Sequence, residues 1–279
     1  MSDWKKQFPK ENIFYETENG ILYCDEAIKT MSKFPENVFD AIITDPPYGV
    51  TACNWDAVIP FEDMWRELKR IRKDITPILL FGTEPFSSYL RMSNTKEYKY
   101  DWYWEKDKGT GVGFSHKQPL RKIENICVFY KKQPKYDWKG EELKKPYKHI
   151  LSIKHKGAFN MSCDKNIDEN GNRQYAIYTH KTKHNLIYFP RDCAKNIETF
   201  HPTQKPLALM EYLIKTYTNE GDLILDFTCG SGTTLVACEK LNRKWVGIEI
   251  SKEYCEITKQ RIEEELKNKK KKLKNKLFE

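Results

Sequence analysis

The stretch GDLILDFTCGSGTTLVACEKL, residues 221–241, places a short apolar run, an acid and two glycines directly before a helical pattern. The apolar run predicts a buried strand with Asp226 at its carboxyl end, and residues 234–241 predict a helix. A second apolar run over 244–250 predicts the next strand. Strand, glycine turn, helix and strand in this order predict one unit of a parallel α/β sheet.

The glycine turn falls where ligands of open α/β sheets bind, beyond the carboxyl ends of the strands. Gly230 and Gly232 let the backbone turn sharply and approach a ligand closely. Glu249 follows Asp226 by 23 residues, near the spacing of about 20 expected for an acid that binds ribose hydroxyls. Neither phosphate-binding glycine pattern is complete, because no lysine follows Gly232 and Leu235 replaces the third glycine. Asp226 suits a cationic, amine-bearing ligand; the alternative is a turn that only packs the helix on the sheet.

The same alternation of strands and helices runs through most of the chain and predicts an α/β fold with a mostly parallel sheet. Further strands are expected over 21–25, 38–45, 76–82, 100–106 and 125–132, and further helices over 27–35, 60–74, 84–94, 205–218 and 251–269.

Residues 131–200 differ from the rest, since they are polar, basic and without long apolar periodicity. They predict an insertion of loops and short elements rather than a second full core. The expected division is therefore 1–130, 131–200, 201–265 and a basic tail, 266–279. A solvated helix end explains the lysine run of this tail better than a dedicated DNA-binding arm does.

A second stretch, AIITDPPYGV at residues 41–50, ends an apolar run at an acid and then stiffens the chain. Asp45 is followed by Pro46, Pro47 and Tyr48. Each proline fixes its own φ angle and keeps the residue before it out of the helical region. The Asp45 carboxylate and the Pro46 carbonyl are thereby held at a set separation. Taken alone, the motif equally fits a turn that ends a strand, because Asp-Pro pairs are common in turns.

Three motifs together resemble those of DNA amino-methyltransferases. LDFTCGSGTT (225–234) resembles their cofactor-binding motif, and TDPPYG (44–49) resembles their catalytic motif of Asp, Asn or Ser before Pro-Pro and an aromatic residue. HPTQKP (201–206) resembles the segment that helps hold the amino-acid end of the cofactor. The catalytic motif precedes the cofactor motif, as in the circularly permuted β group of these enzymes. The segment 81–106 is similar to small methylases encoded by phages and prophages.

The resemblance implies a Rossmann-like, circularly permuted fold of S-adenosylmethionine-dependent methyltransferases, with helices on both faces of the sheet. It covers residues 20–130 and 200–262, and 131–200 takes the place of a target-recognition region. Many relatives have Pro-Phe after the aspartate of the cofactor motif, where this chain has Phe227-Thr228. Phe227 is therefore the side chain expected on the cofactor.

The implied reaction transfers a methyl group from S-adenosylmethionine to the N6 amine of an adenine flipped out of duplex DNA. Ionised Asp45 can accept one amine N–H and the Pro46 carbonyl the other, which frees the nitrogen lone pair for attack. Pro47 has no N–H to compete, and the Tyr48 ring offers a face on which the base can stack. An initial aspartate is more typical of N6-adenine enzymes in the family. N4-cytosine methylation is the alternative, followed by a catalytically silent DNA-binding module and by an RNA or protein methyltransferase.

The remaining candidate residues are placed near the cofactor. Asp25 is expected to meet the adenine amine, although an acid favoured by the dipole of the following helix explains it equally well. Thr203 and Lys205 of HPTQKP are expected at the cofactor carboxylate, and Thr233 belongs to the cofactor motif. The basic, glycine-rich segment 109–122 fits a strand of a DNA cleft or a plain surface loop.

Composition sets limits on partners and location. The formal net charge of +8 favours an anionic partner, nucleic acid first, although solubility alone would also account for it. No two of the eight cysteines have zinc-knuckle spacing, and no metal site is expected. The chain shows neither a membrane-spanning run nor a secretory signal, so a cytoplasmic protein with reduced thiols is expected. Duplex DNA is the expected partner; a separate cognate restriction endonuclease is possible, and the protein is a monomer or a homodimer.

Overall fold

The computed structural model describes residues 4–49, 57–150, 175–192 and 204–276. The chain divides into two compact units, one formed by residues up to Tyr136 together with those from Asn185 onward, and a second formed by Asp137–His184.

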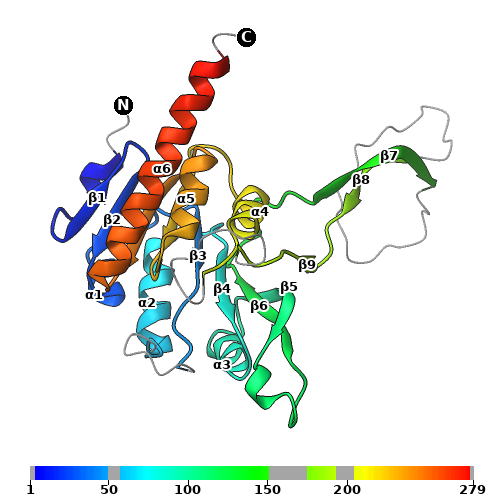
Figure 1. Ribbon diagram of the computed structural model, residues 1–279, viewed down its shortest axis with the longest axis horizontal. Helices are drawn as coiled ribbons and strands as arrows, with labels where there is room; N and C mark the ends of the chain where they lie inside the picture. The colour runs from blue at the N-terminus through cyan, green and yellow to red at the C-terminus, as the bar shows by residue number, and fades with distance from the viewer. Residues whose placement is uncertain (1–3, 50–56, 151–174, 193–203, 277–279) are drawn as a thin grey trace. The chain divides into compact units, whose positions relative to one another are not determined.

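The first unit is built on a nine-stranded sheet in the order β1-β2-β11-β10-β3-β4-β6-β5-β9, which Figure 1 shows from β1 on the left to β5 and β9 on the right. Its strands are β1 (Ile13–Glu16), β2 (Gly20–Cys24), β3 (Ala41–Thr44), β4 (Ile78–Gly82), β5 (Tyr98–Thr110), β6 (Arg121–Phe129), β9 (Leu186–Tyr188), β10 (Leu223–Asp226) and β11 (Lys244–Glu249). Its α-helices are α1 (Ala27–Met31), α2 (Phe61–Ile71), α3 (Phe86–Ser93), α4 (Leu207–Tyr217), α5 (Thr233–Lys240) and α6 (Lys252–Lys276).

The middle of this sheet is parallel. β2, β11, β10, β3 and β4 pair in parallel in that order, so their carboxyl ends meet at one edge. β1 pairs antiparallel with β2 at one side, and β6 pairs antiparallel with both β4 and β5 at the other. The predicted α/β fold with a mostly parallel sheet is confirmed.

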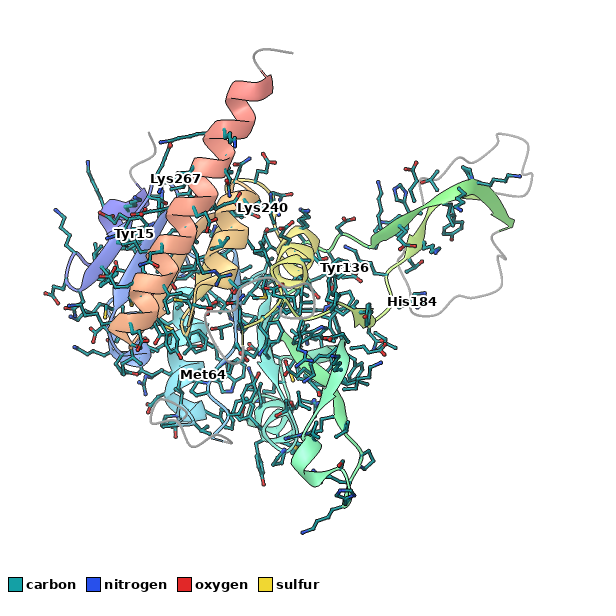
Figure 2. The ribbon with its side chains drawn as sticks, viewed as in Figure 1. Tyr15, Met64, Tyr136, His184, Lys240 and Lys267 are labelled. Carbon is teal, nitrogen blue, oxygen red and sulfur yellow. The ribbon has the colours of Figure 1, made fainter. Side chains whose placement is uncertain are left out.

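The sheet is covered on both faces, because successive strand residues point to opposite sides. On β10, Ile224 packs in a cluster with residues of α4, α5 and α6, whereas Leu225 packs in a cluster with residues of α1, α2 and α3. Ile43 and Ile42 of β3 divide between the two clusters in the same way. Met64 of α2, labelled in Figure 2, belongs to the second cluster. Such two-sided burial explains why these strands are continuous apolar runs.

The second unit differs from the predicted loops and short elements. β7 (Lys139–Ile150) and β8 (Tyr175–Thr182) form an antiparallel hairpin. Its strands are mainly polar, so they carry no apolar alternation that would have predicted them. The unit is also narrower than the predicted 131–200, because β9 pairs with β5 in the main sheet.

The lysine run near the carboxyl end is helical, since α6 continues through it to Lys276. Lys267, labelled in Figure 2, lies on α6 within this run. Cys255, Thr258 and Ile262 form a buried stripe along the earlier part of the helix, which packs against α5, β2 and β11. Among the helices that the structure describes, none has the length and apolar character needed to cross a membrane.

Candidate active site

A cavity of about 730 Å³ opens at the edge where the parallel strands end. It is lined by residues that follow β2, β3, β10 and β11, together with residues of β5 and β6. Of the sequence-predicted site residues, it brings together Asp25, Asp45, Pro46, Pro47, Tyr48, Lys205, Asp226, Phe227, Gly230, Thr233 and Glu249. Gly232 shapes the turn behind this wall, and Thr203 lies outside the described residues.

Both carboxylate oxygens of Asp45 already accept hydrogen bonds. The Nζ of Lys205 lies 2.5 Å from Oδ2, and the Tyr48 hydroxyl donates to Oδ1. The backbone carbonyl of Asp45 accepts from Oγ1 of Thr228 at 3.1 Å. The Tyr48 ring packs against Phe86 with their centroids 4.9 Å apart. Asp45 and Tyr48 are therefore held in place by neighbours on other segments of the chain.

Lys205 joins Asp45 to a second acid, Glu124 of β6. Its Nζ lies 3.4 Å from Oε2 of Glu124, whose Oε1 lies 3.2 Å from the Nζ of Lys106 on β5. Burial and the Glu124 carboxylate raise the pKa of Asp45, while the Lys205 ammonium lowers it. Burial alone would lower the pKa of Lys205, but Asp45 and Glu124 outweigh it and raise this pKa. The predicted contact of Lys205 with a cofactor carboxylate stays a prediction.

Asp226 lies at the end of β10, deep in the cavity wall. Its carboxylate accepts a hydrogen bond from the Thr44 hydroxyl, and Oδ1 accepts another from the backbone N–H of Thr228 at 3.3 Å. Burial raises the pKa of Asp226 to about 6, against the lowering effect of its hydrogen bonds from Thr234 and Thr44. The Thr44 and Thr228 hydroxyls are 2.9 Å apart, so hydrogen bonds join the ends of β3 and β10.

Glu249, at the end of β11, organises the glycine turn. Its Oε2 accepts from the backbone N–H of Gly230 at 2.8 Å, and its Oε1 accepts from the N–H of Ser251 at 2.8 Å. Gly232 precedes α5 with a φ of +76°, a conformation that favours glycine. Arg261 of α6 donates to Thr233 Oγ1 at 3.1 Å and also to Ser231. The turn is thus fixed from both β11 and α6.

Gly232→Ala is expected to lower the free energy of unfolding more than Gly221→Ala does, because the two glycines share a backbone conformation but not their surroundings. Both φ angles are positive, +76° and +83°, so each alanine carries a backbone cost of about 1–2 kcal/mol. A Cβ at 232 would lie 2.5 Å from Cγ2 of Thr258, whereas a Cβ at 221 would meet nothing within 4 Å. Denaturant unfolding measures the difference; equal losses would show that Thr258 yields without cost.

Asp25 and Phe227 line the cavity, but both side chains already have partners within the protein. Asp25 accepts hydrogen bonds from Asn12 at 2.7 Å and from Lys29 at 3.0 Å, while the neighbouring Glu26 caps α1 with its own carboxylate. The side chain of Phe227 is only 1% exposed and packs in the cluster with α1, α2 and α3, although the residue lines the cavity. The predicted contacts of both residues with a cofactor stay predictions.

Several cavity residues were not predicted from the sequence, Glu124 and Lys106 above all. A period of two would have found both. Glu124 lies on the same strand face as Ile126 and Val128, and Lys106 lies on the same face as Trp104, so both charges project from buried apolar faces. Ile250 was also missed; it is 62% exposed and lines the cavity directly after Glu249.

The described part of the chain contains no group of three or more His, Cys, Asp or Glu side chains that could hold a metal ion. Cys24, Cys127, Cys229, Cys238 and Cys255 are free thiols.

A permuted parallel sheet, a glycine turn flanked by strand-terminal acids and Asp-Pro-Pro-Tyr in the same cavity define the methyltransferase class of α/β proteins. The family model described as DNA methylase matches residues 39–260, and the chain belongs to this family of N6 and N4 DNA methylases. The type II methyltransferase M.HpaI of Haemophilus parainfluenzae is 31% identical over 259 residues, which cover 88% of this chain and 74% of that protein.

Two solved structures show the likeness in three dimensions. The M1.HpyAVI–SAM complex has a TM-score of 0.56 and 25% identity, over 86% of this chain and 98% of that one. The cytosine-N4-specific PvuII DNA methyltransferase has a TM-score of 0.63 over 90% of this chain and 89% of that one. At 16% identity, the second likeness shows a shared fold alone.

Proposed function

We propose that this protein transfers the methyl group of S-adenosylmethionine to the exocyclic N6 amine of an adenine flipped out of duplex DNA. One observation carries the proposal: Asp45 and Pro46 line the same cavity as Asp226, the glycine turn and Glu249. The two acceptors for an amine and the groups suited to a nucleoside cofactor therefore share one enclosed space. Membership of the DNA methylase family supports the reaction class.

The residues of the cavity fit S-adenosylmethionine. Oε2 of Glu249 accepts from Gly230 and Oε1 from Ser251, and because a carboxylate offers about four lone-pair sites, acceptor capacity remains for ribose hydroxyls. Asp226 is a buried acid suited to an ammonium group. The exposed side chain of Ile250 offers an apolar surface for the adenine ring. When bound, the cofactor supplies a methyl group on a positively charged sulfur.

The catalytic side of the cavity prepares the amine for attack. The Asp45 carboxylate and the Pro46 carbonyl accept its two hydrogens, which draws the nitrogen towards tetrahedral geometry and stabilises the positive charge that develops there. The prolines and the hydrogen bond from Thr228 to the Asp45 carbonyl hold the backbone of this segment, so little backbone reorganisation is needed. Stacking of the base on Tyr48 contributes about 1–3 kcal/mol towards the cost of flipping.

Adenine is proposed as the base because the catalytic motif begins with aspartate. The chemistry of the cavity suits both exocyclic amines, since adenine N6 and cytosine N4 each present two N–H groups. The second unit, which lies within the predicted recognition region 131–200, is proposed to read the DNA sequence. Its described strands carry lysines suited to phosphate contacts, among them Lys139, Lys144 and Lys181.

The test is methyl transfer from labelled S-adenosylmethionine to unmethylated duplex DNA, with nucleoside analysis and mapping of the modified sites. N6-methyladenine at a fixed short sequence is the expected product. N4-methylcytosine would keep the mechanism and overturn the base assignment. Parallel reactions with RNA and protein test the other substrate classes, and absence of label in DNA with label in either of them would overturn the proposal.

Protection of DNA extends the proposal to a cellular role. M.HpaI is named a type II methyltransferase, and we infer the same role for this chain beside a separate endonuclease with the same recognition sequence. DNA from cells that express the protein is then expected to resist one restriction enzyme that cleaves DNA from control cells. Uniform sensitivity at the mapped methylation sequence would contradict this role.

Cofactor affinity is expected to weaken as the pH falls below about 6. Burial raises the pKa of Asp226 to about 6, so acidification protonates its carboxylate and removes the negative charge that attracts the cofactor ammonium. Each further unit of pH lowers the affinity by up to about tenfold, whereas the affinity stays level above pH 7. Calorimetric titration between pH 5 and 8 measures the profile.

The control for this profile is Asp226→Asn, which cannot ionise. Its affinity should be weaker than that of the wild type at neutral pH and level across the same range. If the affinity of Asp226→Asn still falls at low pH as it does in the wild type, a group other than Asp226 causes the decrease.

A further inference from the structure

Four charged side chains form a chain of contacts along one wall of the cavity. The Nζ of Lys205 lies 2.5 Å from Asp45 Oδ2 and 3.4 Å from Glu124 Oε2, and the Nζ of Lys106 lies 3.2 Å from Glu124 Oε1. Lys205 and Lys106 are 6% and 4% exposed. Two acids and two lysines alternate, so the cluster is neutral as a whole although each member is largely removed from water.

The arrangement conflicts with substrate binding as it stands. Asp45 has to accept an N–H from the target amine, yet Lys205 and the Tyr48 hydroxyl donate to its two oxygens. The positive charge of Lys205 also partly neutralises the Asp45 carboxylate. The carboxylate therefore attracts the positive charge that develops on the amine less strongly. Loss of the Asp45 contact would take the nearer of two carboxylates from the buried Lys205 ammonium, which is unfavourable unless the other carboxylate compensates.

The Glu124 carboxylate is a second partner for Lys205, and the ammonium can reach it with little movement. Its Oε2 lies 3.4 Å from Nζ, longer than an ordinary N–H···O hydrogen bond of about 2.7–3.2 Å, so a small movement of the lysine would shorten this contact while lengthening the one to Asp45. Lys106 holds the other oxygen of Glu124 and also lies 5.8 Å from the centroid of the Trp104 ring. The acceptor for Lys205 is therefore fixed from the opposite side.

We propose that Glu124 is a positioning residue for methyl transfer: it takes the Lys205 ammonium away from Asp45 when the target amine binds. The proposal rests on the proposed function, because it needs Asp45 to accept an amine hydrogen. Lys205 then moves between two carboxylates, and the buried cluster keeps its charge balance in both positions.

The charge changes during the reaction agree with this role. The carbon–sulfur bond breaks as the carbon–nitrogen bond forms, so the positive charge passes from sulfur to the amine nitrogen. That nitrogen then gives one proton to Asp45, which becomes neutral. Lys205 keeps a charged partner at this stage only through Glu124. The proton leaves Asp45 for solvent when the methylated base departs.

Glu124→Gln tests the proposal, because it removes the charge while preserving the size of the side chain. We expect kcat to fall about tenfold, with the affinity for S-adenosylmethionine unchanged within about twofold. The groups that face Asp45 are Lys205, Tyr48, Glu124 and Asp226. Loss of the Glu124 charge favours ionised Asp45, so the acid limb of kcat/KM should move to lower pH. A residue that only supports the fold would leave this limb in place.

Two further variants make the result specific. In a Lys205→Met background, Glu124→Gln should change kcat less than about twofold, because Glu124 acts through the lysine. Glu105→Gln is the matched control: Glu105 lies on β5 next to Lys106 but pairs with the half-exposed Lys122 at 2.7 Å, and transfer should be unchanged. Thermal unfolding of every variant reports any loss of folded protein.

The outcomes separate this inference from the proposed function. If the wild type methylates DNA and Glu124→Gln does so with the same kcat, the role of Glu124 would be overturned, while the proposed function would stand. The same loss in both the wild-type and the Lys205→Met background would also overturn it, since Glu124 would then act independently of the lysine. A wild type that methylates no duplex DNA would overturn the proposed function and the role of Glu124 together.

Discussion

Asp45→Ala is expected to lower kcat for methyl transfer by about a thousandfold while leaving cofactor affinity within a few-fold of the wild type. The substitution removes a charged acceptor that acts on the reacting nitrogen, and loss of a single group of this kind typically costs about 10²–10³ in kcat. Asp226 and Glu249, the proposed acceptors for the cofactor ammonium and ribose, end β10 and β11 and have hydrogen-bond partners other than Asp45, so their geometry does not depend on this side chain. Single-turnover transfer and calorimetric titration measure the two effects separately.

The control for this prediction is another aspartate beside the same strand. Asp40 precedes β3, where it contacts Lys73 at 2.5 Å and accepts from the N–H of Leu223 at 2.9 Å, remote from the cavity lining. Asp40→Ala should cost stability but retain transfer in the folded protein. Turnover of Asp45→Ala within about tenfold of the wild type would contradict its role as amine acceptor.

Glu249→Ala is expected to weaken the binding of S-adenosylmethionine by about a hundredfold. A hydrogen bond to a charged group contributes about 1.5–3 kcal/mol, and the substitution removes the acceptor for ribose together with the partner of the Gly230 N–H. Once the cofactor is saturating, kcat should recover to within a few-fold of the wild type, because Asp45 is untouched. Equilibrium titration and the dependence of rate on cofactor concentration measure this split.

Glu253→Ala serves as the comparison, since Glu253 is an exposed acid in the first turn of α6 and does not line the cavity. Its affinity for the cofactor should equal that of the wild type. A Glu249→Ala enzyme with unchanged affinity would remove this acid from the ribose-binding role. A loss confined to kcat at saturating cofactor would place it on the catalytic side instead.

The parallel part of the fold could be predicted from the sequence because its strands are buried on both faces. The runs around β3, β4, β10 and β11 are continuous and apolar, and the helices between them have clear periodicity. β1 and β9 have no comparable pattern, since β1 is half-exposed and β9 is three residues long. β7 and β8 are mainly polar in sequence and pair with each other, and local composition does not reveal such a pairing.

The candidate site was predictable in its motifs but not in its contacts. Asp45 and Asp226 stand out in the sequence because each ends an apolar strand. The contact between Asp45 and Lys205 joins positions 160 residues apart, and it depends on which strands become neighbours. Glu124 carries a weaker signal, a charge at a spacing of two from Ile126 and Val128 on the apolar face of β6, directly before the predicted strand 125–132.

The two ends of the second unit, Asp137–His184, lie next to each other, and this affects how such proteins can diversify. Its two ends are hydrogen-bonded neighbours: the N–H of Lys183 donates to the carbonyl of Trp138 at 3.2 Å, and Lys139 pairs with Thr182. The described lining of the cavity includes no residue of this unit. A different segment can therefore be exchanged between these paired ends while every side chain assigned to chemistry is inherited intact. Under the proposed function, recombination that replaces this one segment would give the enzyme a new target sequence and leave the residues of its active site unchanged.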